Sequence, residues 1–300
     1  MSAREVERLR RGVRCERARD VGGGPLTRTK HRGAGRRPVT LAKRVKFCRM
    51  DYAGQFSVVI PTLQRSDDLR TVVDQCAAHP LVAEVLVINN ATDPLAFESP
   101  KVRVLDQGRN IFVNPAWNLG AREARGEYLA IINDDILFED GALTHAQRAL
   151  RSRRFGVIGP AQDAFNRPAH GRRRVKIAPF FSFKGSFGTF MCLRRADYTP
   201  IPEEMRIWGG DDWLFLTQSR PNGVLSGYRF DTEMGTSSGS PEFQALRAAE
   251  LATARPILMP LYRTRWWHRP VEYLDRIRKF SKRLRRSDDP RSRTTAHESQ

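Results

Sequence analysis

The sequence predicts an α/β domain built on a mostly parallel central sheet with helices on both faces. Between about residues 56 and 158, short runs rich in β-branched residues alternate with longer segments of helical periodicity. Such alternation is typical of parallel sheets, whose crossover helices cover both faces. Three of the predicted strands end in polar residues, and 40% of the 300 residues are hydrophobic, which is a globular composition. The length favours one core with extensions.

The predicted elements follow one another regularly up to Gly159. Strands are expected at 56–60, 84–88, 102–105, 128–132 and 155–158. Helices are expected from the 66–68 cap to about 78, at about 115–125 with Gly126 as its stop, and at 140–151. Beyond Gly159, shorter strands are expected near 175–183, 187–194 and 228–231, and helices from Asp211 and over 241–254.

The positive charge belongs to the two ends of the chain. Residues 1–50 carry 16 Lys/Arg against 4 Asp/Glu, and residues 263–300 carry 12 against 5, whereas residues 51–262 carry 24 of each. We expect 1–50 to be a disordered basic extension, because it lacks periodic apolar residues; alternatively, translation begins at Met50. Any polyanion binding is assigned to the ends first.

Cysteine usage and the lack of long apolar segments indicate the cellular compartment. Cys15, Cys48, Cys76 and Cys192 lie far apart, which favours thiols in a reducing compartment over a zinc or redox site. No apolar run approaches the roughly 20 residues that cross a bilayer, and the N-terminus lacks the apolar core of a secretory signal. These observations predict a cytoplasmic protein.

The sharpest local feature is Asn133–Asp135, directly after an apolar strand. In an open parallel sheet, ligands bind beyond the carboxyl ends of the strands, and Pro61–Thr62 and Asn89–Asn90 end two other strands. Two adjacent carboxylates there suit a hydrated divalent cation, Mn²⁺ or Mg²⁺, and a ribose hydroxyl. The alternative is that Asp134 or Asp135 caps the helix that follows.

A second acidic pair lies in the run Trp208-Gly-Gly-Asp-Asp-Trp213. The glycines allow the backbone to bend closely around a ligand, and the two tryptophans offer flat faces for a sugar. Asp211 and Asp212 start a predicted helix, where one carboxylate is able to accept a proton from an incoming hydroxyl. The alternative is again helix capping.

These motifs resemble the large family 2 of inverting glycosyltransferases with the GT-A fold. The resemblance covers about residues 56–255, within a domain expected at 51–262, and its motifs occur in the family's order. They are Val59-Ile-Pro-Thr-Leu-Gln-Arg65, the segment from Asn110 through Asn118-Leu-Gly120 to Gly126, Asn133–Asp135 in place of the DXD motif, and Asp211–Asp212 in place of the Glu-Asp acceptor motif.

The resemblance implies transfer of a sugar from a nucleotide-sugar donor to an acceptor hydroxyl on a glycan, a lipid-linked glycan or another acceptor, with a divalent cation, Mn²⁺ or Mg²⁺. Asp212 would be the catalytic base, Asp211 would bind the acceptor, and Asp135 would ligate the metal. The implied nucleotide-binding residues are Pro61, Thr62, Arg65, Asn90, Asn118 and Asp134.

Three positions depart from the family pattern. Asn89–Asn90 stands where an acidic residue commonly reads the base, and Phe112 stands where Gly usually follows the first Asn. The family often supplies a histidine metal ligand after the strand that ends here at Asp231. Glu233 is the substitute we expect, with His268 as the alternative. The departures keep open an inactive scaffold of the same fold.

The C-terminal segment 266–286 predicts a basic amphipathic helix, followed by a disordered tail to residue 300. Val271, Leu274, Ile277, Phe280 and Leu284 recur at helical spacing among seven Lys and Arg residues. This pattern suits peripheral contact with an anionic membrane surface, at the inner membrane face for a cytoplasmic protein. It suits equally a terminal helix packed on the domain.

Two other classes of function are disfavoured. A nucleotidyltransferase would need a Gly-rich, basic phosphate loop after the first strand, and none is present there. A nucleic-acid-binding protein would depend on the basic ends alone, since the central segment is neutral and carries no recognisable module. No specific nucleic-acid partner is therefore expected.

Overall fold

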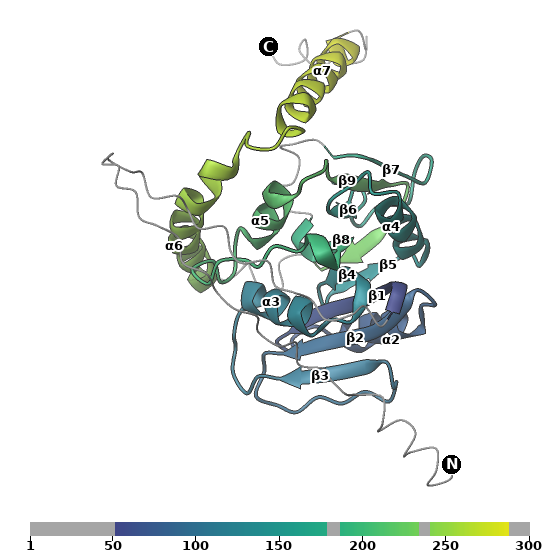
Figure 1. The fold of residues 1–300 in the computed structure, drawn as a ribbon, viewed down its shortest axis with the longest axis vertical. Helices are drawn as coiled ribbons and strands as arrows, with labels where there is room; N and C mark the ends of the chain where they lie inside the picture. Colours follow the sequence, from purple (N-terminus) through teal and green to yellow (C-terminus); the bar gives the residue numbers. More distant parts are fainter. Residues whose placement is uncertain (1–51, 179–186, 234–240, 288–300) are drawn as a thin grey trace, which may run out of the picture. The chain divides into compact units, whose positions relative to one another are not determined.

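Figure 1 shows a computed structural model in which a large central sheet is flanked by helices. The structure describes residues 52–178, 187–233 and 241–287, all within one compact unit that spans 46–300. The predicted disordered extension at 1–50 and the tail at 288–300 lie outside the described residues.

The first half of the sheet is parallel throughout. Its strands lie in the order β3-β2-β1-β4 and are β1 (Tyr52–Thr62), β2 (Val82–Asn89), β3 (Val102–Asp106) and β4 (Gly126–Ile132). In β1, β2 and β4 the central residues are almost all Val, Ile, Leu or Ala and are fully buried, as expected for strands covered on both faces, whereas β3 at the edge is only half-buried. The predicted strands in this region are confirmed.

The second half of the sheet introduces antiparallel pairs. β8 (Phe190–Arg194) runs antiparallel to both β4 and β6 (Ile158–Pro160), β9 (Gly223–Ser226) runs parallel to β6, and β7 (Arg174–Ile177) closes the edge antiparallel to β9. Only β8 and β7 therefore oppose the common direction of this sheet, which is mostly parallel as predicted. A separate antiparallel pair joins β5 (Ile136–Phe138) to β10 (Phe230–Thr232).

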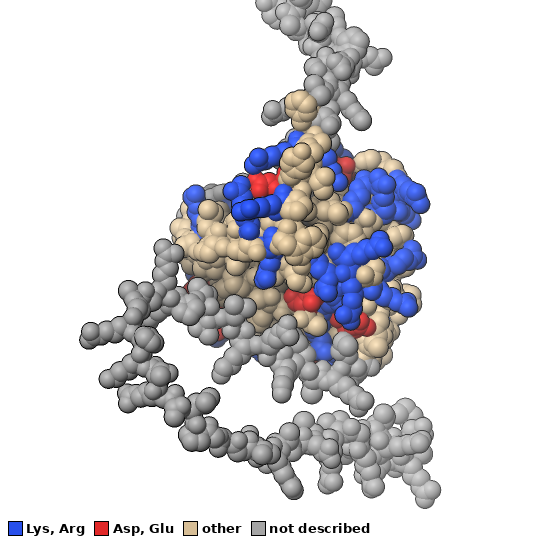
Figure 2. Space-filling model, turned by 45° about the horizontal axis from the view of Figure 1, so that its top comes forward, with Lys and Arg blue, Asp and Glu red and all other residues tan. Residues whose placement is uncertain are grey.

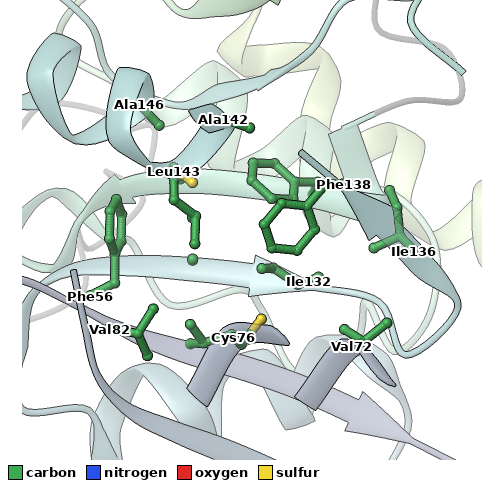
Figure 3. Packing of buried hydrophobic residues seen from close by; sticks show 14 of the residues in the cluster. Phe56, Val72, Cys76, Val82, Ile132, Ile136, Phe138, Ala142, Leu143 and Ala146 are labelled. Carbon is green, nitrogen blue, oxygen red and sulfur yellow. The ribbon is translucent and has the colours of Figure 1, made fainter. Parts of the chain in front are cut away.

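Helices cover both faces, and alternate residues of the strands supply two cores. In β1, Val58 and Ile60 face the core under α2 (Leu69–Ala78) and α4 (Gly141–Arg151), part of which Figure 3 shows. Val59 faces the opposite core. That second core lies under four helices, which are α3 (Val113–Glu123), α5 (Gly210–Thr217), α6 (Pro241–Leu258) and α7 (His268–Ser287).

Gly126 does not end a helix, contrary to the sequence-based prediction. α3 ends at Glu123, Ala124 is already extended, and Gly126 begins β4. A Cβ at Gly126 would lie 2.5 Å from the backbone nitrogen of Ser57 in β1, so a glycine is needed for the two strands to approach. β5 and β9 were not predicted, because both are short and lie in segments of mixed polarity.

No helix in the described ranges is long and apolar enough to cross a membrane. The two cysteines that the structure describes, Cys76 and Cys192, are buried thiols.

Candidate active site

The carboxyl ends of β1, β2 and β4 bring polar side chains together. The Thr62 hydroxyl, at the end of β1, donates a hydrogen bond of 2.5 Å to Asp134 Oδ2, beyond the end of β4. The backbone amide of Asn90, beyond β2, donates to the Thr62 carbonyl at 2.8 Å. The Asn90 side chain is buried, and its Oδ1 has no hydrogen-bond partner among the described residues. A buried acceptor without a donor is suited to receive one from a ligand.

Asp134 and Asp135 lie in the loop between β4 and β5 and cap no helix. The next helix, α4, begins only at Gly141, with Asp140 at its cap position. Burial raises the pKa of Asp134 to about 6, against the opposing effect of the Thr62 hydrogen bond. Burial also raises the pKa of Asp135, to which the Thr232 hydroxyl donates at 3.2 Å. The helix-capping alternative is therefore wrong.

The chemistry of Asp135 fits a divalent cation. Its Oδ1 is buried and has no hydrogen-bond partner among the described residues, so a hard oxygen ligand is left available. Mg²⁺ is often held by one or two carboxylates together with substrate phosphates, which makes one such residue sufficient. No group of three or more His, Cys, Asp or Glu within the described ranges is arranged to hold a metal.

The two candidates for a further metal ligand differ in their surroundings. Glu233 is exposed and follows Thr232, which contacts Asp135, but the chain from 234 to 240 lies outside the described residues. His268 is buried at the start of α7, with its ring 4.2 Å from that of Trp267. Burial lowers the pKa of His268 to about 4. Its surroundings are those of a packing residue.

The Gly-Gly pair before the second acidic pair serves packing as well as chain direction. Gly209 has a φ of 82°, and a Cβ there would lie 2.8 Å from the Met205 side chain. A Cβ at Gly210 would lie 2.0 Å from Asn114 Oδ1, in α3. Trp213 is half-buried and donates from its indole to the Thr199 carbonyl at 3.2 Å. The close packing of the two glycines and the hydrogen bond of Trp213 anchor the start of α5 to the rest of the domain.

Asp211 and Asp212 lie in the first turn of α5, where the helix dipole favours negative charge. Burial raises the pKa of Asp211, while hydrogen bonds from the backbone amides of Asp212 and Gly188 oppose that rise. Asp212 lies near enough to Tyr262 to raise the pKa of that phenol, although burial of Tyr262 contributes more.

A short helical turn, η1 (Phe187–Thr189), contacts residues of both acidic segments. A Cβ at Gly188 would lie 3.5 Å from Asp211 Oδ2, and the next residue, Thr189, accepts a 2.9 Å hydrogen bond from the Asn133 amide through its carbonyl. Asn133 directly precedes Asp134. η1 therefore lies next to both Asp211 and Asn133.

The loop before Gly209 is held from two sides. Asn114 donates from Nδ2 to the Met205 carbonyl at 3.0 Å, and its backbone amide donates to the Arg206 carbonyl at 3.0 Å. Glu250 of α6 accepts from the backbone amides of Arg206 and Ile207 at 3.2 and 3.0 Å. Neither Asn114 nor Glu250 was a predicted site residue, because each acts through tertiary contacts.

Asn118, a predicted nucleotide-binding residue, is occupied by the protein itself. Its Oδ1 accepts from the Tyr198 hydroxyl at 2.8 Å and from the Ile201 amide at 2.9 Å, and its Nδ2 donates to the Ile201 carbonyl. These bonds tie α3 to the segment after β8. These bonds give Asn118 a positioning role, and its acceptor capacity is used within the protein.

The remaining predicted nucleotide-binding residues lie at or next to the end of β1. Pro61 is buried within the strand, opposite Ile88 of β2, whereas Arg65 is exposed in the loop that follows. Arg65 forms no hydrogen bond or ion pair in the described part of the chain. Its guanidinium is therefore available to an anionic ligand.

Gln64 and Asp106, which lie at this edge, were missed as site residues in the sequence. Gln64, with a φ of 57°, donates from Nε2 to Asn89 Oδ1 at 3.0 Å, and Asn89 donates to Asp106 Oδ1 at 2.8 Å. The loops after β1, β2 and β3 are thereby connected. The signal in the sequence is a polar residue at or just beyond the end of each neighbouring strand.

Residues 57–203 match the family model described as glycosyl transferase family 2. Among curated proteins, the comparison finds no match. S. aureus TarS 1–349 in complex with UDP-GlcNAc is a similar solved structure, with 15% identity and a TM-score of 0.47 over 66% of each chain. GalNAc-T7 with UDP, GalNAc and Mn²⁺ is similar with 13% identity and a TM-score of 0.47, over 62% of this chain and 45% of that one.

The chain spans 65% of the uncomplexed TarS 1–349 chain and 39% of a longer TarS chain. At these identities the structural likeness concerns the fold alone. The family match covers β1 through β8, which includes Thr62, Asn90, Asp134 and Asp135. Residues 57–203 are therefore a family-2-like glycosyltransferase segment, as the sequence motifs predicted.

Proposed function

We propose that this protein transfers a sugar from a nucleoside diphosphate donor to an acceptor hydroxyl, with inversion at the anomeric carbon. The observation that supports the proposal is that η1 contacts both Asn133, directly before Asp134, and Asp211, on the acidic pair of α5. Asp134 and Asp135 suit the nucleoside diphosphate part of a donor, and Asp211 and Asp212 suit an incoming hydroxyl.

On the donor side, Asp134 would accept a hydrogen bond from a ribose hydroxyl, with its other oxygen held by Thr62. Asn90 Oδ1 would accept from a donor group on the base, and Arg65 would pair with phosphate. Asp135 would hold a divalent cation, Mn²⁺ or Mg²⁺, with Glu233 as a second ligand. Such a cation neutralises charge on the diphosphate leaving group when bound.

On the acceptor side, Asp212 would take the proton of the acceptor hydroxyl as its oxygen bonds to the anomeric carbon. The bond from that carbon to the donor phosphate oxygen breaks in the same displacement, and the nucleoside diphosphate leaves. Asp211, anchored by the amides of Asp212 and Gly188, would orient the acceptor. Attack opposite the leaving group inverts the anomeric configuration.

The donor side is tested by thermal shift of the full chain with UDP, GDP, dTDP and CDP, each with and without Mn²⁺. We expect one nucleotide to stabilise the protein only with metal, and Asp135→Ala to abolish that shift. Asp74→Asn, an exposed carboxylate on α2, is the matched control and should behave as the wild type. No shift with any nucleotide, in folded protein, would contradict the donor assignment.

Turnover separates a transferase from an inactive scaffold of the same fold. With the nucleotide sugar that corresponds to the stabilising nucleotide, we expect slow metal-dependent hydrolysis of the donor even without an acceptor. Metal-dependent nucleotide binding without hydrolysis or transfer to any hydroxyl acceptor would support the scaffold. A peripheral membrane contact of 266–286 does not enter this reaction.

A further inference from the structure

The beginning of α7 is packed on the domain. Trp267 is buried, its indole donates to the Gln218 carbonyl at 3.0 Å, and its ring lies 5.6 Å from that of Phe215 in α5. Val271, one turn further, is also buried. The sequence placed Val271 on one apolar face with Leu274, Ile277 and Phe280, but the structure separates them. Of these four residues only Val271 faces the core. The prediction of a terminal helix packed on the domain therefore holds for the inner side of α7 alone.

The outer side of α7 and the turn before it carry an exposed apolar stripe, which we define as Trp266, Tyr273, Ile277 and Phe280. Their exposed fractions are 72%, 66%, 44% and 65%. Within α7, steps of four and three residues place Tyr273, Ile277 and Phe280 on one side of the helix, and Trp266 precedes its first residue by two positions. Large apolar side chains aligned in this way mark an interaction surface more often than isolated ones do.

Next to the stripe lies a cavity of about 270 Å³ lined by arginines. Its lining residues are Arg263, Arg269, Glu272, Tyr273 and Arg276. Arg263 and Arg276 each donate to Glu272 Oε1 at 2.9 Å, which satisfies that carboxylate. Arg269 forms no ion pair with any described residue. The cavity therefore keeps an excess positive charge, and it shares Tyr273 with the apolar stripe.

The surrounding surface is also basic. Figure 2 shows Lys and Arg side chains on both sides of a band of uncharged residues at the end of the molecule that it brings forward. Exposed basic residues near β7 and at the end of α4 include Arg151, Arg153, Arg154, Arg172, Arg174 and Lys176. The sequence adds Lys282, Arg283, Arg285 and Arg286 later in α7. An apolar stripe flanked by cations complements an anionic lipid surface.

We propose that α7 docks on an anionic lipid bilayer, with the apolar stripe inserted at the interface and a lipid headgroup phosphate in the arginine cavity. Two copies of this chain meeting through the stripe would bring like charges together, which disfavours a second copy as the occupant. Nucleic acid would satisfy the arginines but would leave the stripe in water. A bilayer satisfies both features at once, because its phosphates lie directly above its apolar region.

The test is flotation of the full chain with phosphatidylcholine vesicles that contain or lack phosphatidylglycerol. We expect binding only to the anionic vesicles. Phe280→Ser should lower the partition coefficient by about tenfold, since an inserted aromatic ring is lost. Arg269→Gln should lower it by about fivefold, the contribution of one cation at such a surface. Both side chains are exposed, so the melting temperature should not change.

Two matched controls separate α7 from the rest of the chain, including its basic N-terminal segment. Leu251→Ser removes an exposed leucine of α6, and Arg122→Gln removes an exposed arginine of α3. Both should bind as the wild type does. Equal binding by all four variants would overturn the proposal, as would displacement by inorganic phosphate together with an unaffected Phe280→Ser. A changed oligomeric state in Phe280→Ser with unchanged vesicle binding would also overturn it.

Discussion

The two sides of the candidate site are held by different parts of the fold. On the donor side, Thr62, Asn90 and Asp134 lie at or just beyond strand ends that pair in register. On the acceptor side, Asp211 and Asp212 sit on a helix of eight residues, whose approach loop is held by Asn114 from α3 and Glu250 from α6. One side follows from strand pairing, and the other depends on packing between distant helices.

The difference predicts how each side responds to damage. The strand ends of the donor side belong to a sheet that lies between two cores. They should keep their geometry when a helix on one face of the sheet is perturbed. The acceptor side should lose its geometry whenever the contacts of α3, α6 or α7 with α5 are changed. Changes near α5 should therefore alter transfer before they alter nucleotide binding.

The largest effect is expected from removing the proposed base. Asp212→Asn preserves size but provides no carboxylate to accept the proton, so kcat for transfer should fall by about 10²- to 10⁴-fold. Affinity for the nucleoside diphosphate should stay unchanged, because it depends on the strand ends. Steady-state kinetics and calorimetric nucleotide titration measure the two quantities. Retained transfer would exclude Asp212 as the base, and a parallel loss of affinity would contradict the separation of the two sides.

A methyl group at Gly210 should destabilise the acceptor side. The Cβ of Gly210→Ala would lie 2.0 Å from Asn114 Oδ1, and forcing such a group into a packed site costs about 1–3 kcal/mol of unfolding free energy. Urea denaturation measures the loss. In an Asn114→Ala background the same substitution should cost less, because the clashing oxygen is gone. Equal costs in the two backgrounds would place the strain elsewhere.

His268 should make stability depend on pH. Burial lowers its pKa from 6.5 to about 4, so between these values the unfolded chain binds a proton that the folded chain does not. Stability from this residue is therefore present at neutral pH and is lost as the pH falls towards 4. We expect a contribution of about 1–3 kcal/mol at pH 7.

Substitution of His268 isolates this effect. His268→Gln should flatten the dependence of unfolding free energy on pH between about 6.5 and 4. Denaturant titrations at a series of pH values provide the test. Identical slopes in the wild type and His268→Gln would show that another group titrates with unfolding.

The smallest effect concerns backbone strain at Phe112, just before α3. Phe112 has φ 68° and ψ 170°, a conformation that is nearly restricted to glycine, and its ring stacks under Arg206 with the guanidinium 4.9 Å from the ring centre. Phe112→Ala and Phe112→Gly both remove the ring, but only glycine relieves the strain. Phe112→Gly should be more stable than Phe112→Ala by about 1 kcal/mol. Equal melting temperatures would indicate that no strain is present.

Much of the fold could be predicted because its signals are local. Strand and helix alternation up to Gly159 follows from short β-branched runs and helical periodicity, and the four parallel strands appear where expected. Gly126 was misread because the need for glycine arises from Ser57 across the sheet, whereas a C-cap is judged from neighbours in sequence. β5 and β10 are short strands whose pairing depends on the rest of the fold.

By itself, the sequence determined that polar residues at the strand ends share one edge, because parallel strands present their carboxyl ends together. Thr62 and Asp134 are 72 residues apart, and their contact still follows from that rule. Only the tertiary structure decided that η1 contacts both Asn133 and Asp211, that Asn118 is occupied by Tyr198 and Ile201, and that Val271 is buried while Phe280 is exposed. These arrangements depend on how helices pack, and packing reflects the shapes of many distant side chains at once.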